Sequence, residues 1–434
     1  MMLVPWLVVL LGGICGIQAV SLDRTGQESF LNHRLVDVNI TTEEQQQYVI
    51  DMDDVGNMGL DMWLVPTLTR TGRLRVPPES IDLFMTLMNT AGISSKIRHH
   101  NIKQLNDDTY SMPSEDPALY KDFIEGVVRH NAYYRLANLD AYMSNFATFS
   151  GVTKGYLARS TYEGRDTPYI EITGGSSSNK KRIFIEAGIH AREWVSPASA
   201  MYFIDRMLHR RDLDADASFL YNNFEWYIVP VTNPDGYEYS HTSYRYWRKN
   251  RSIISGCGSS RGVDLNRNFD SMWGGSGSSG SCSSDSFRGP SVFSEIETQN
   301  LRDKVQDIQN ERGPISAYLS IHSFSQLILT PYGFAQNTYP PNNDHIVETS
   351  NLAKDAIFAS DGRTYRVGSS ADILSVIHGG SRDWARQTED IPYAITFELR
   401  PSSGGLEGFV LPAAQIAPCS KEIWDAIYAI AGNL

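Results

Sequence analysis

The strongest constraint on the fold is an alternation of short apolar runs with helical patterns in the C-terminal part of the chain. The runs have the length and the content of β-branched and aromatic residues of buried strands: 169–172, 182–189, 227–231, 315–321 and 393–397. Helical periodicity lies between and after them, over 196–208, 295–310, 345–359 and 413–434. Buried strands separated by helices are typical of an α/β protein. We therefore expect an α/β fold with a mixed, centrally parallel, twisted sheet that carries helices on both faces.

Three of these runs end at a side chain that can bind a metal or move a proton. His190 follows the second run, His322 the fourth and Glu398 the fifth, and Glu193 lies three residues after His190. Because ligand sites in open α/β sheets gather beyond the carboxyl ends of the central strands, we expect these four side chains at one rim. Two imidazoles and one carboxylate leave a coordination position open, which is the ligand count of a catalytic zinc site. Zinc lowers the pKa of a bound water towards about 7, and a neighbouring carboxylate can take its proton.

Each of these residues has a simpler interpretation when it is taken alone. The pair His190 and Glu193 is a short motif that arises by chance, and its alternative is a turn histidine before a glutamate favoured by a helix dipole. His322 alone is more often a core histidine than a ligand. The placement of all three at strand ends favours the metal site.

Charge and composition exclude several classes of protein. The 434 residues contain 38 Lys plus Arg against 50 Asp plus Glu, a formal net charge of -12, which argues against a nucleic-acid binder that neutralises phosphates. A hydrophobic fraction of 41% excludes a disordered chain. The length indicates two or three modules. We expect partners to be peptides or small molecules.

The N-terminus has the pattern of an export signal. An apolar run from Met2 to Ile14 is followed by small residues up to Ala19, so we expect a signal peptide over 1–19. A transmembrane anchor is the alternative, but the run is short and no stop-transfer charges follow it. We therefore expect a secreted, extracellular protein with no membrane association. Sequons occur at Asn39 and Asn250, and either can remain unmodified.

The cysteines fit an oxidising compartment. Cys15 leaves with the signal, so three cysteines remain and one of them has no partner in the chain. Cys257 and Cys282 flank a Gly/Ser-rich loop, and we expect a disulfide between them. Cys419 precedes an apolar helical pattern and is expected to be a buried thiol.

Residues 20–129 form a first module with its own strand and helix signals. Their order is strand, helix, strand, strand, helix and an extended segment, over 34–40, 42–50, 62–66, 73–76, 80–91 and 94–102. This is the order of the split β-α-β open sandwich, a ferredoxin-like α+β fold. A helical connector over 117–128 ends at Arg129, where a trypsin-like protease could cut, although an ordinary interdomain helix is the alternative. A second domain over 130–434 follows.

Five segments of the chain resemble motifs of the animal metallocarboxypeptidases of the A and B type, which are secreted proenzymes. The resemblance covers nearly the whole chain after the signal. The segments are Gly188–Trp194 (GIHAREW), Trp247–Arg251 (WRKNR), Val263–Asn268 (VDLNRN), Ser320–Ser323 (SIHS) and Thr396–Arg400 (TFELR). The resemblance implies an activation propeptide with a helical connector over 20–129 and a catalytic zinc carboxypeptidase domain over 130–434.

The resemblance also implies roles for the residues of the metal site. His190, Glu193 and His322 would bind one Zn²⁺ per chain, and Glu398 would be the general base that later returns the proton. Arg248 would polarise the scissile carbonyl and stabilise the developing oxyanion, an effect often worth several kcal/mol.

Other matching residues are expected to bind the substrate. Asn266 and Arg267 would hold its terminal carboxylate, for which the fork of an arginine is well shaped. Arg192 would meet the peptide further upstream, and Asp264 would fix the tautomer of His190. Without the zinc site, solvated surface charges would be the preferred interpretation of these arginines.

The sequence departs from the family at two positions in the substrate site. Ser375 stands where the family usually has a mobile tyrosine, and we expect altered substrate affinity rather than lost chemistry, unless the local register shifts. Arg382 stands at the floor of the specificity pocket. Because a buried unpaired guanidinium is costly, we expect a preference for C-terminal acidic residues. Alternatively, Arg382 turns outward or pairs with Asp372 or Asp383, which leaves a neutral apolar pocket.

The leading hypothesis is a secreted, digestive zinc exopeptidase, held latent by its propeptide and activated by a trypsin-like protease. We expect a monomer that acts on the C-termini of peptides and proteins. Peptide-hormone processing would use the same residues. A noncatalytic peptide-binding relative would be expected to lose Glu398 or a ligand, and an amidohydrolase of acyl-amino acids has no need for Asn266 and Arg267.

Overall fold

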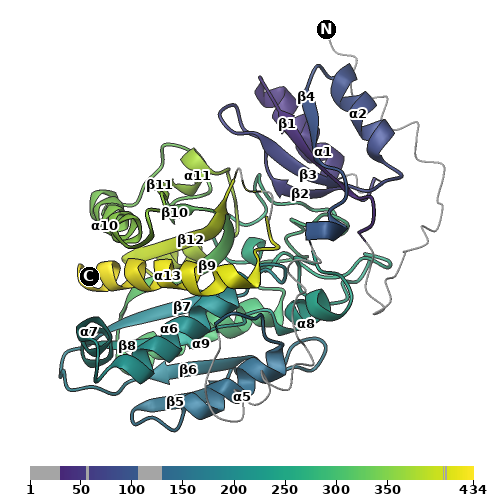
Figure 1. Ribbon diagram of the computed structural model, residues 1–434. Helices are drawn as coiled ribbons and strands as arrows, with labels where there is room; N and C mark the ends of the chain where they lie inside the picture. The colour runs from purple at the N-terminus through teal and green to yellow at the C-terminus, as the bar shows by residue number, and fades with distance from the viewer. Residues whose placement is uncertain (1–29, 55–57, 106–129, 404, 406–407) are drawn as a thin grey trace.

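The computed structural model describes residues 30–54, 58–105, 130–403, 405 and 408–434, and Figure 1 shows two parts of unequal size. The expected signal over 1–19, the connector over 117–128 and the cleavage position Arg129 lie outside the described residues. In the described part of the chain, no helix has the length and apolar character needed to cross a membrane.

The N-terminal part is a four-stranded antiparallel sheet with two helices. Its strands are β1 (Arg34–Asn39), β2 (Asp61–Leu64), β3 (Gly72–Val76) and β4 (Ser94–His99), in the order β2-β3-β1-β4. Helices α1 (Glu43–Asp54) and α2 (Ile81–Thr90) share one apolar core with the sheet. Alternation along β1 points Val36 and Val38 at these helices and Leu35 at the opposite face. The predicted open sandwich is confirmed.

The larger part is built on an eight-stranded sheet. Its strands are β5 (Val152–Tyr156), β6 (Pro168–Ile172), β7 (Lys181–Ala187), β8 (Phe224–Val229), β9 (Ile315–Ser325), β10 (Leu327–Thr330), β11 (Arg366–Ser369) and β12 (Tyr393–Ser402). The order is β11-β10-β12-β9-β7-β8-β6-β5. The four central strands β12, β9, β7 and β8 are parallel, while β10 and β6 run antiparallel to their inner neighbours. The predicted mixed sheet with a parallel centre is confirmed.

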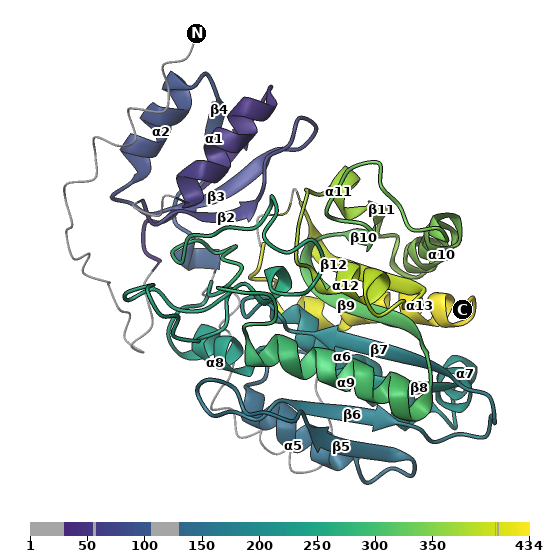
Figure 2. The same cartoon turned by 180° about the vertical axis from the view of Figure 1, so that it is seen from behind.

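Helices cover both faces of this sheet (Figures 1 and 2). One face carries α5 (Leu136–Phe146), α6 (Val195–Arg210), α10 (Asn343–Asp361) and α13 (Ile416–Ala431), and the other carries α9 (Ile296–Arg312) and α12 (Ser381–Gln387). Apolar residues of α13 recur every three or four positions, and all are fully buried: Ile416, Cys419, Ile423, Ile427 and Ile430. Each buried isoleucine contributes about 1.5–3 kcal/mol to folding.

The sequence prediction was wrong about where two strands end. His322 and Glu398 were expected just beyond strand ends, but β9 continues to Ser325 and β12 to Ser402. A polar side chain that lines a cleft interrupts the apolar run without interrupting the backbone hydrogen bonds. The apolar run therefore marks the extent of the core and not the extent of the strand.

The two parts meet through the sheet face of the N-terminal domain that its helices leave uncovered. Trp63 of β2 contacts Tyr246 and Phe409 of the larger part, with ring centroids 5.1 and 5.5 Å away. Phe30 contacts Tyr246 edge to face at 4.7 Å. These residues form one buried apolar cluster that also contains Leu35 and Phe324. A separate apolar cluster, shared by both parts, therefore holds the N-terminal domain against the larger part.

Candidate active site

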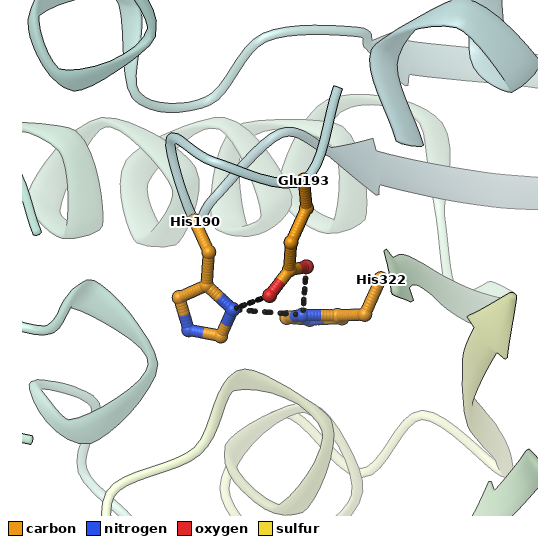
Figure 3. Close-up of side chains that lie close together, drawn as sticks. All are labelled: His190, Glu193 and His322. Atoms are coloured by element: carbon orange, nitrogen blue, oxygen red, sulfur yellow. Dashed lines mark hydrogen bonds and ion pairs between the residues drawn. The ribbon is translucent and has the colours of Figure 1, made fainter. Parts of the chain in front are cut away.

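Three buried side chains, two from the turn after β7 and one from β9, converge on one point (Figure 3). Nδ1 of His190 lies 2.8 Å from Oε1 of Glu193, and Nδ1 of His322 lies 3.1 Å from Oε2 of the same carboxylate. The two Nδ1 atoms are 3.1 Å apart. One ligand atom from each residue lies within 4.8 Å of the other two. The structure thus brings together the three side chains that the sequence proposed as metal ligands.

The turn after β7 places His190 and needs glycine at position 188. Gly188 has φ +63°, and a Cβ atom there would lie 2.9 Å from Pro197 and 3.1 Å from the carbonyl oxygen of Pro230. The Gly188 amide donates to Oγ of Ser196 at 2.9 Å. This tight turn brings His190 and Glu193 to the same side of the chain before α6 begins.

The charges around the cluster suit a divalent cation. Burial alone would raise the pKa of Glu193, but His190 and His322 outweigh it and lower that pKa, so the carboxylate is ionised. Nε2 of His190 lies 3.2 Å from Oδ1 of Asp264. A proton held on Nε2 by this carboxylate leaves the Nδ1 lone pair for a metal. Two imidazoles and a carboxylate are ligands that zinc prefers.

Asp264 also orients a guanidinium towards the cluster. Its Oδ2 accepts from Nε and Nη2 of Arg248 at 3.0 and 2.9 Å, and Nη1 of Arg248 lies 3.8 Å from Oε1 of Glu193. Burial acts to raise the pKa of Asp264, but Arg248, Arg267 and His190 outweigh it and hold that pKa well below its usual value. Asp264 is therefore an anion that fixes both His190 and Arg248.

Glu398 lies beside the cluster because of the sheet register. In the parallel pair β12 and β9, Glu398 is the direct partner of His322. Removal from water raises the pKa of Glu398 to about 8, with a further increase from Glu193 and opposing effects from His322, Arg248 and Arg382. A carboxyl group with a raised pKa beside a cation site is suited to accept and return a proton.

Asn266 and Arg267 lie in a short 3₁₀ helix, η2 (Leu265–Arg267), directly after Asp264. Nε of Arg267 donates to the carbonyl oxygen of Gly277 at 2.6 Å, and its Nη1 donates to that of Asn266 at 3.0 Å. Burial lowers the pKa of Arg267 to about 10, which leaves it charged at neutral pH. Oδ1 of Asn266 accepts from the Ser381 amide at 2.9 Å, so Asn266 faces the start of α12.

Arg192 is covered by the N-terminal domain. Its Nη1 lies 2.7 Å from Oδ1 of Asp61 on β2 and 3.3 Å from Oδ2 of Asp285. Burial acts to raise the pKa of Asp61, but Arg192 and Arg75 outweigh it and lower that pKa to about 2. Sequence reasoning missed Asp61, because nothing in the local pattern of β2 marks a residue that pairs across domains.

Arg382 is buried at the start of α12, so the alternative in which it turns outward is wrong, whereas the alternative in which it pairs with a neighbouring acid is present. It pairs instead with its neighbour: Nε and Nη2 each lie 2.9 Å from Oδ1 of Asp383. Asp372, the other acid considered, accepts from the Asn337 amide and the Tyr339 hydroxyl. Within the described residues, Nη1 of Arg382 has no hydrogen-bond partner.

Ser375 lies half-buried in the segment between α11 (Ser370–Ile373) and α12. Its amide donates to the carbonyl oxygen of Ser370 at 2.9 Å. The preceding carbonyl, that of Leu374, accepts from Nη2 of Arg70 in the N-terminal domain at 2.9 Å. The segment with Ser375 is therefore held by the domain that also covers Arg192.

The predicted disulfide Cys257–Cys282 is present, and Cys419 is fully buried without a disulfide partner in the described part of the chain. The two sequons differ sharply. Asn250 is fully buried and its side-chain amide donates to Glu295 and Glu297. Asn39 is exposed at the end of β1. Of these two asparagines, only Asn39 is exposed in the folded protein.

Comparison with known proteins agrees with this fold and site. Residues 139–426 match the family model "Zinc carboxypeptidase", and residues 36–109 match "Carboxypeptidase activation peptide". Carboxypeptidase A2 of Rattus norvegicus is 33% identical over 93% of this chain and 94% of its own. Carboxypeptidase O of Bos taurus is 38% identical over 69% of this chain and 78% of its own. The crystal structure of carboxypeptidase A from Helicoverpa armigera is 30% identical, with a TM-score of 0.83 over 93% of this chain and 98% of that one.

The class is thus a metallocarboxypeptidase, a hydrolase built on a mixed α/β sheet. The chain belongs to the zinc carboxypeptidase family and carries the activation peptide of a zymogen at its N-terminal side. Its substrates are peptides.

Proposed function

We propose that this chain is a secreted zinc carboxypeptidase proenzyme that removes the C-terminal residue of peptides and proteins. The observation that carries the proposal is the convergence of His190, Glu193 and His322 on one point, with Glu398 as the in-register neighbour of His322. One Zn²⁺ per chain would be held by the three converging side chains. When bound, zinc supplies a Lewis acid that makes water more acidic and polarises a carbonyl.

The chain's own groups divide the remaining work. Glu398 takes the proton of the attacking water on its carboxylate and later gives it to the leaving amine. Arg248, fixed by Asp264, holds its guanidinium where negative charge develops on the carbonyl oxygen of the substrate. Because Asp264 satisfies Nε and Nη2, Nη1 remains for the substrate.

Arg267 and Asn266 are proposed to bind the free carboxylate of the substrate, which restricts cleavage to the last peptide bond. The bond from Arg267 to the carbonyl of Gly277 restrains the guanidinium beside the cluster. A charged guanidinium binds a carboxylate by two parallel hydrogen bonds. Once the N-terminal domain has left, Arg192 loses Asp61 and can contact the peptide upstream, while Asp285 stays beside it.

For the C-terminal side chain, we propose a preference for acidic residues that rests on Arg382. Oδ1 of Asp383 accepts from Nε and lies 2.9 Å from Nη2, so Nη1 remains for a substrate carboxylate. The charge of Arg382 is near enough to lower the pKa of Glu398. The second candidate is an apolar preference, favoured by the same Arg382–Asp383 pair because that pair is neutral as a whole. Ser375 in place of a tyrosine should alter affinity and not chemistry.

Latency is proposed to come from the N-terminal domain, with a boundary at 20–129 after a signal peptide over 1–19. Asp61 pairs with Arg192, and Arg70 holds the Leu374 carbonyl beside the specificity segment. A trypsin-like cut at Arg129 would release a catalytic domain over 130–434. We propose a digestive setting and a monomeric enzyme.

One assay tests the metal and the specificity together. The trypsin-treated protein should hydrolyse peptides that end in Glu, should lose activity with a chelator and should recover with Zn²⁺. Peptides ending in Glu, Phe and Lys distinguish the pocket hypotheses: faster cleavage of Phe or Lys would remove the acidic preference. Activity that survives complete metal removal would overturn the proposed site.

A further inference from the structure

Gly333, in the loop after β10, separates Arg382 from a second polar side chain. A Cβ atom at Gly333 would lie 2.6 Å from Nη2 of Arg382 and 3.4 Å from Cβ of Ser370. The guanidinium and the Ser370 side chain therefore pack against the same side of Gly333, and any other residue at position 333 would displace the guanidinium. Asp383 lies on this side as well, where its Oδ2 accepts from the Gly333 amide at 2.6 Å.

The hydroxyl of Ser370 has no role in the fold that the structure reveals. The residue is fully buried, and its Oγ has no hydrogen-bond partner among the described residues. The first turn of α11 is capped by its neighbour instead, since Oγ of Ser369 accepts from the Asp372 amide at 3.3 Å. A buried hydroxyl without a partner is costly, which favours a partner that arrives with the substrate.

We infer that Ser370 binds the C-terminal side chain of the substrate, as a second hydrogen-bonding group opposite Arg382. The inference rests on the proposed acidic preference and extends it. A carboxylate has two oxygens with about four acceptor positions, enough for Nη1 of Arg382 and one hydroxyl. A serine hydroxyl also accepts hydrogen bonds, so it serves a side-chain amide as well. Arg382 then selects charge, while Ser370 favours any polar group of this shape, Gln included.

The substitution Ser370→Ala should leave the fold intact. It removes a hydroxyl that has no partner, and alanine is a good helix former at a position inside α11. The melting temperature of Ser370→Ala should therefore equal or exceed that of the wild type. Ser370→Cys gives a second variant of nearly the same shape with only a weak donor. Ser350 offers a matched control, since its hydroxyl on α10 is also buried and without a partner in the described chain.

The experiment measures kcat/KM of the activated enzyme on three peptides that differ only in a C-terminal Glu, Gln or Phe. Ser370→Ala and Ser370→Cys should each lower kcat/KM about tenfold for Glu and Gln, mainly through KM, and leave Phe within about twofold. Ser350→Ala should match the wild type on all three peptides.

Two results overturn the inference: unchanged kcat/KM on Glu and Gln, or an equal loss on Glu, Gln and Phe, which indicates a structural role. The ratio of the wild-type kcat/KM values for the peptides that end in Glu and Phe tests the proposed acidic preference separately. A wild type that prefers Glu, combined with unaffected Ser370 variants, removes only the role of Ser370. A wild-type enzyme that prefers the peptide ending in Phe would overturn both the acidic preference and the role of Ser370.

Discussion

Replacing Asp61 by alanine should convert the latent zymogen into a partly active one. Asp61 is the one carboxylate of the described N-terminal domain that pairs with Arg192, at 2.7 Å, and both side chains are at most 3% exposed. Its second oxygen lies 3.3 Å from Nε of Arg75, within its own domain. The substitution leaves Arg192 covered, with Asp285 at 3.3 Å as its remaining acidic partner.

The size of the effect follows from this geometry. Removal of one partner of a buried ion pair costs about 3–5 kcal/mol, because the other charge stays buried and unpaired. Asp285 compensates for part of the charge of Arg192, which places the expected cost near the lower limit, about 3 kcal/mol. At about 1.4 kcal/mol for each factor of ten, the closed arrangement should lose roughly a hundredfold in its equilibrium with the open one.

The assay is hydrolysis of a short peptide by the uncleaved zymogen. Asp61→Ala should raise this activity, and Asp61→Asn, which keeps the shape, should raise it less. Asp51→Asn is the control, because Asp51 is exposed on α1 and accepts a hydrogen bond from Gln47 of the same helix. After removal of the N-terminal domain, all variants have the same catalytic chain, so their kcat/KM values must coincide.

The pH dependence of the zymogen's activity is a second test of the ion pair between Asp61 and Arg192. The pKa of Asp61 is lowered from 3.8 to about 2, so its contribution is complete above pH 3.8 and is lost as pH falls through about 2. Latency of the wild type should therefore hold at pH 5 and weaken below about pH 4. Asp61→Ala zymogen that stays as inactive as the wild type would refute the argument that this pair holds the domain in place.

Three further predictions concern the enzyme and its fold. Glu398→Gln should lower kcat by about 10²–10⁴ without loss of bound metal, measured by activity and metal analysis, and a loss below tenfold would contradict the role of the base. Burial raises the pKa of Glu297 from 4.5 to about 8, so the free energy of unfolding should fall as pH rises from 4.5 to 8. Glu297→Gln should remove this pH dependence: the variant should be more stable than the wild type by up to about 4 kcal/mol at pH 8 and equally stable at pH 4. Denaturant titrations at the two pH values measure this difference. Equal effects of the substitution at both pH values would contradict the prediction. Mass analysis of protein from a eukaryotic secretory host should find glycan at Asn39 and none at Asn250, and modified Asn250 would show that the buried arrangement forms late.

The central strands were predictable because strands buried on both faces are continuous apolar runs. The edge strands β5 and β11 were harder to predict, because they contain polar and exposed residues. The strand β10, which lies between β11 and β12, is only four residues long, so neither length nor periodicity marks it. The ends of β9 and β12 were missed for the opposite reason, since polar residues of the cleft follow the apolar run within the same strand.

The residues of the metal cluster were predictable because short motifs carry them and the sheet topology brings those motifs together. The direction of Arg382 was not, since it depends on an ion pair with the adjacent Asp383 that many side-chain conformations would allow or prevent. The contact of Asp61 with Arg192 joins residues 131 positions apart, and no local pattern encodes it. Long-range pairs of this kind are set by the docking of whole domains.

The register between β12 and β9 makes Glu398 and His322 neighbours through backbone hydrogen bonds. Arg382 and Ser370, which we propose to contact the substrate side chain, lie instead in the short helices α12 and α11 outside the sheet. The groups proposed for the reaction are thus held by the sheet, whereas those proposed for substrate selection are held by segments outside it. Insertions or substitutions in those outer segments can change which peptides are cleaved, while the distance between Glu398 and His322 is preserved. This fold is therefore a favourable starting point for engineering new exopeptidases.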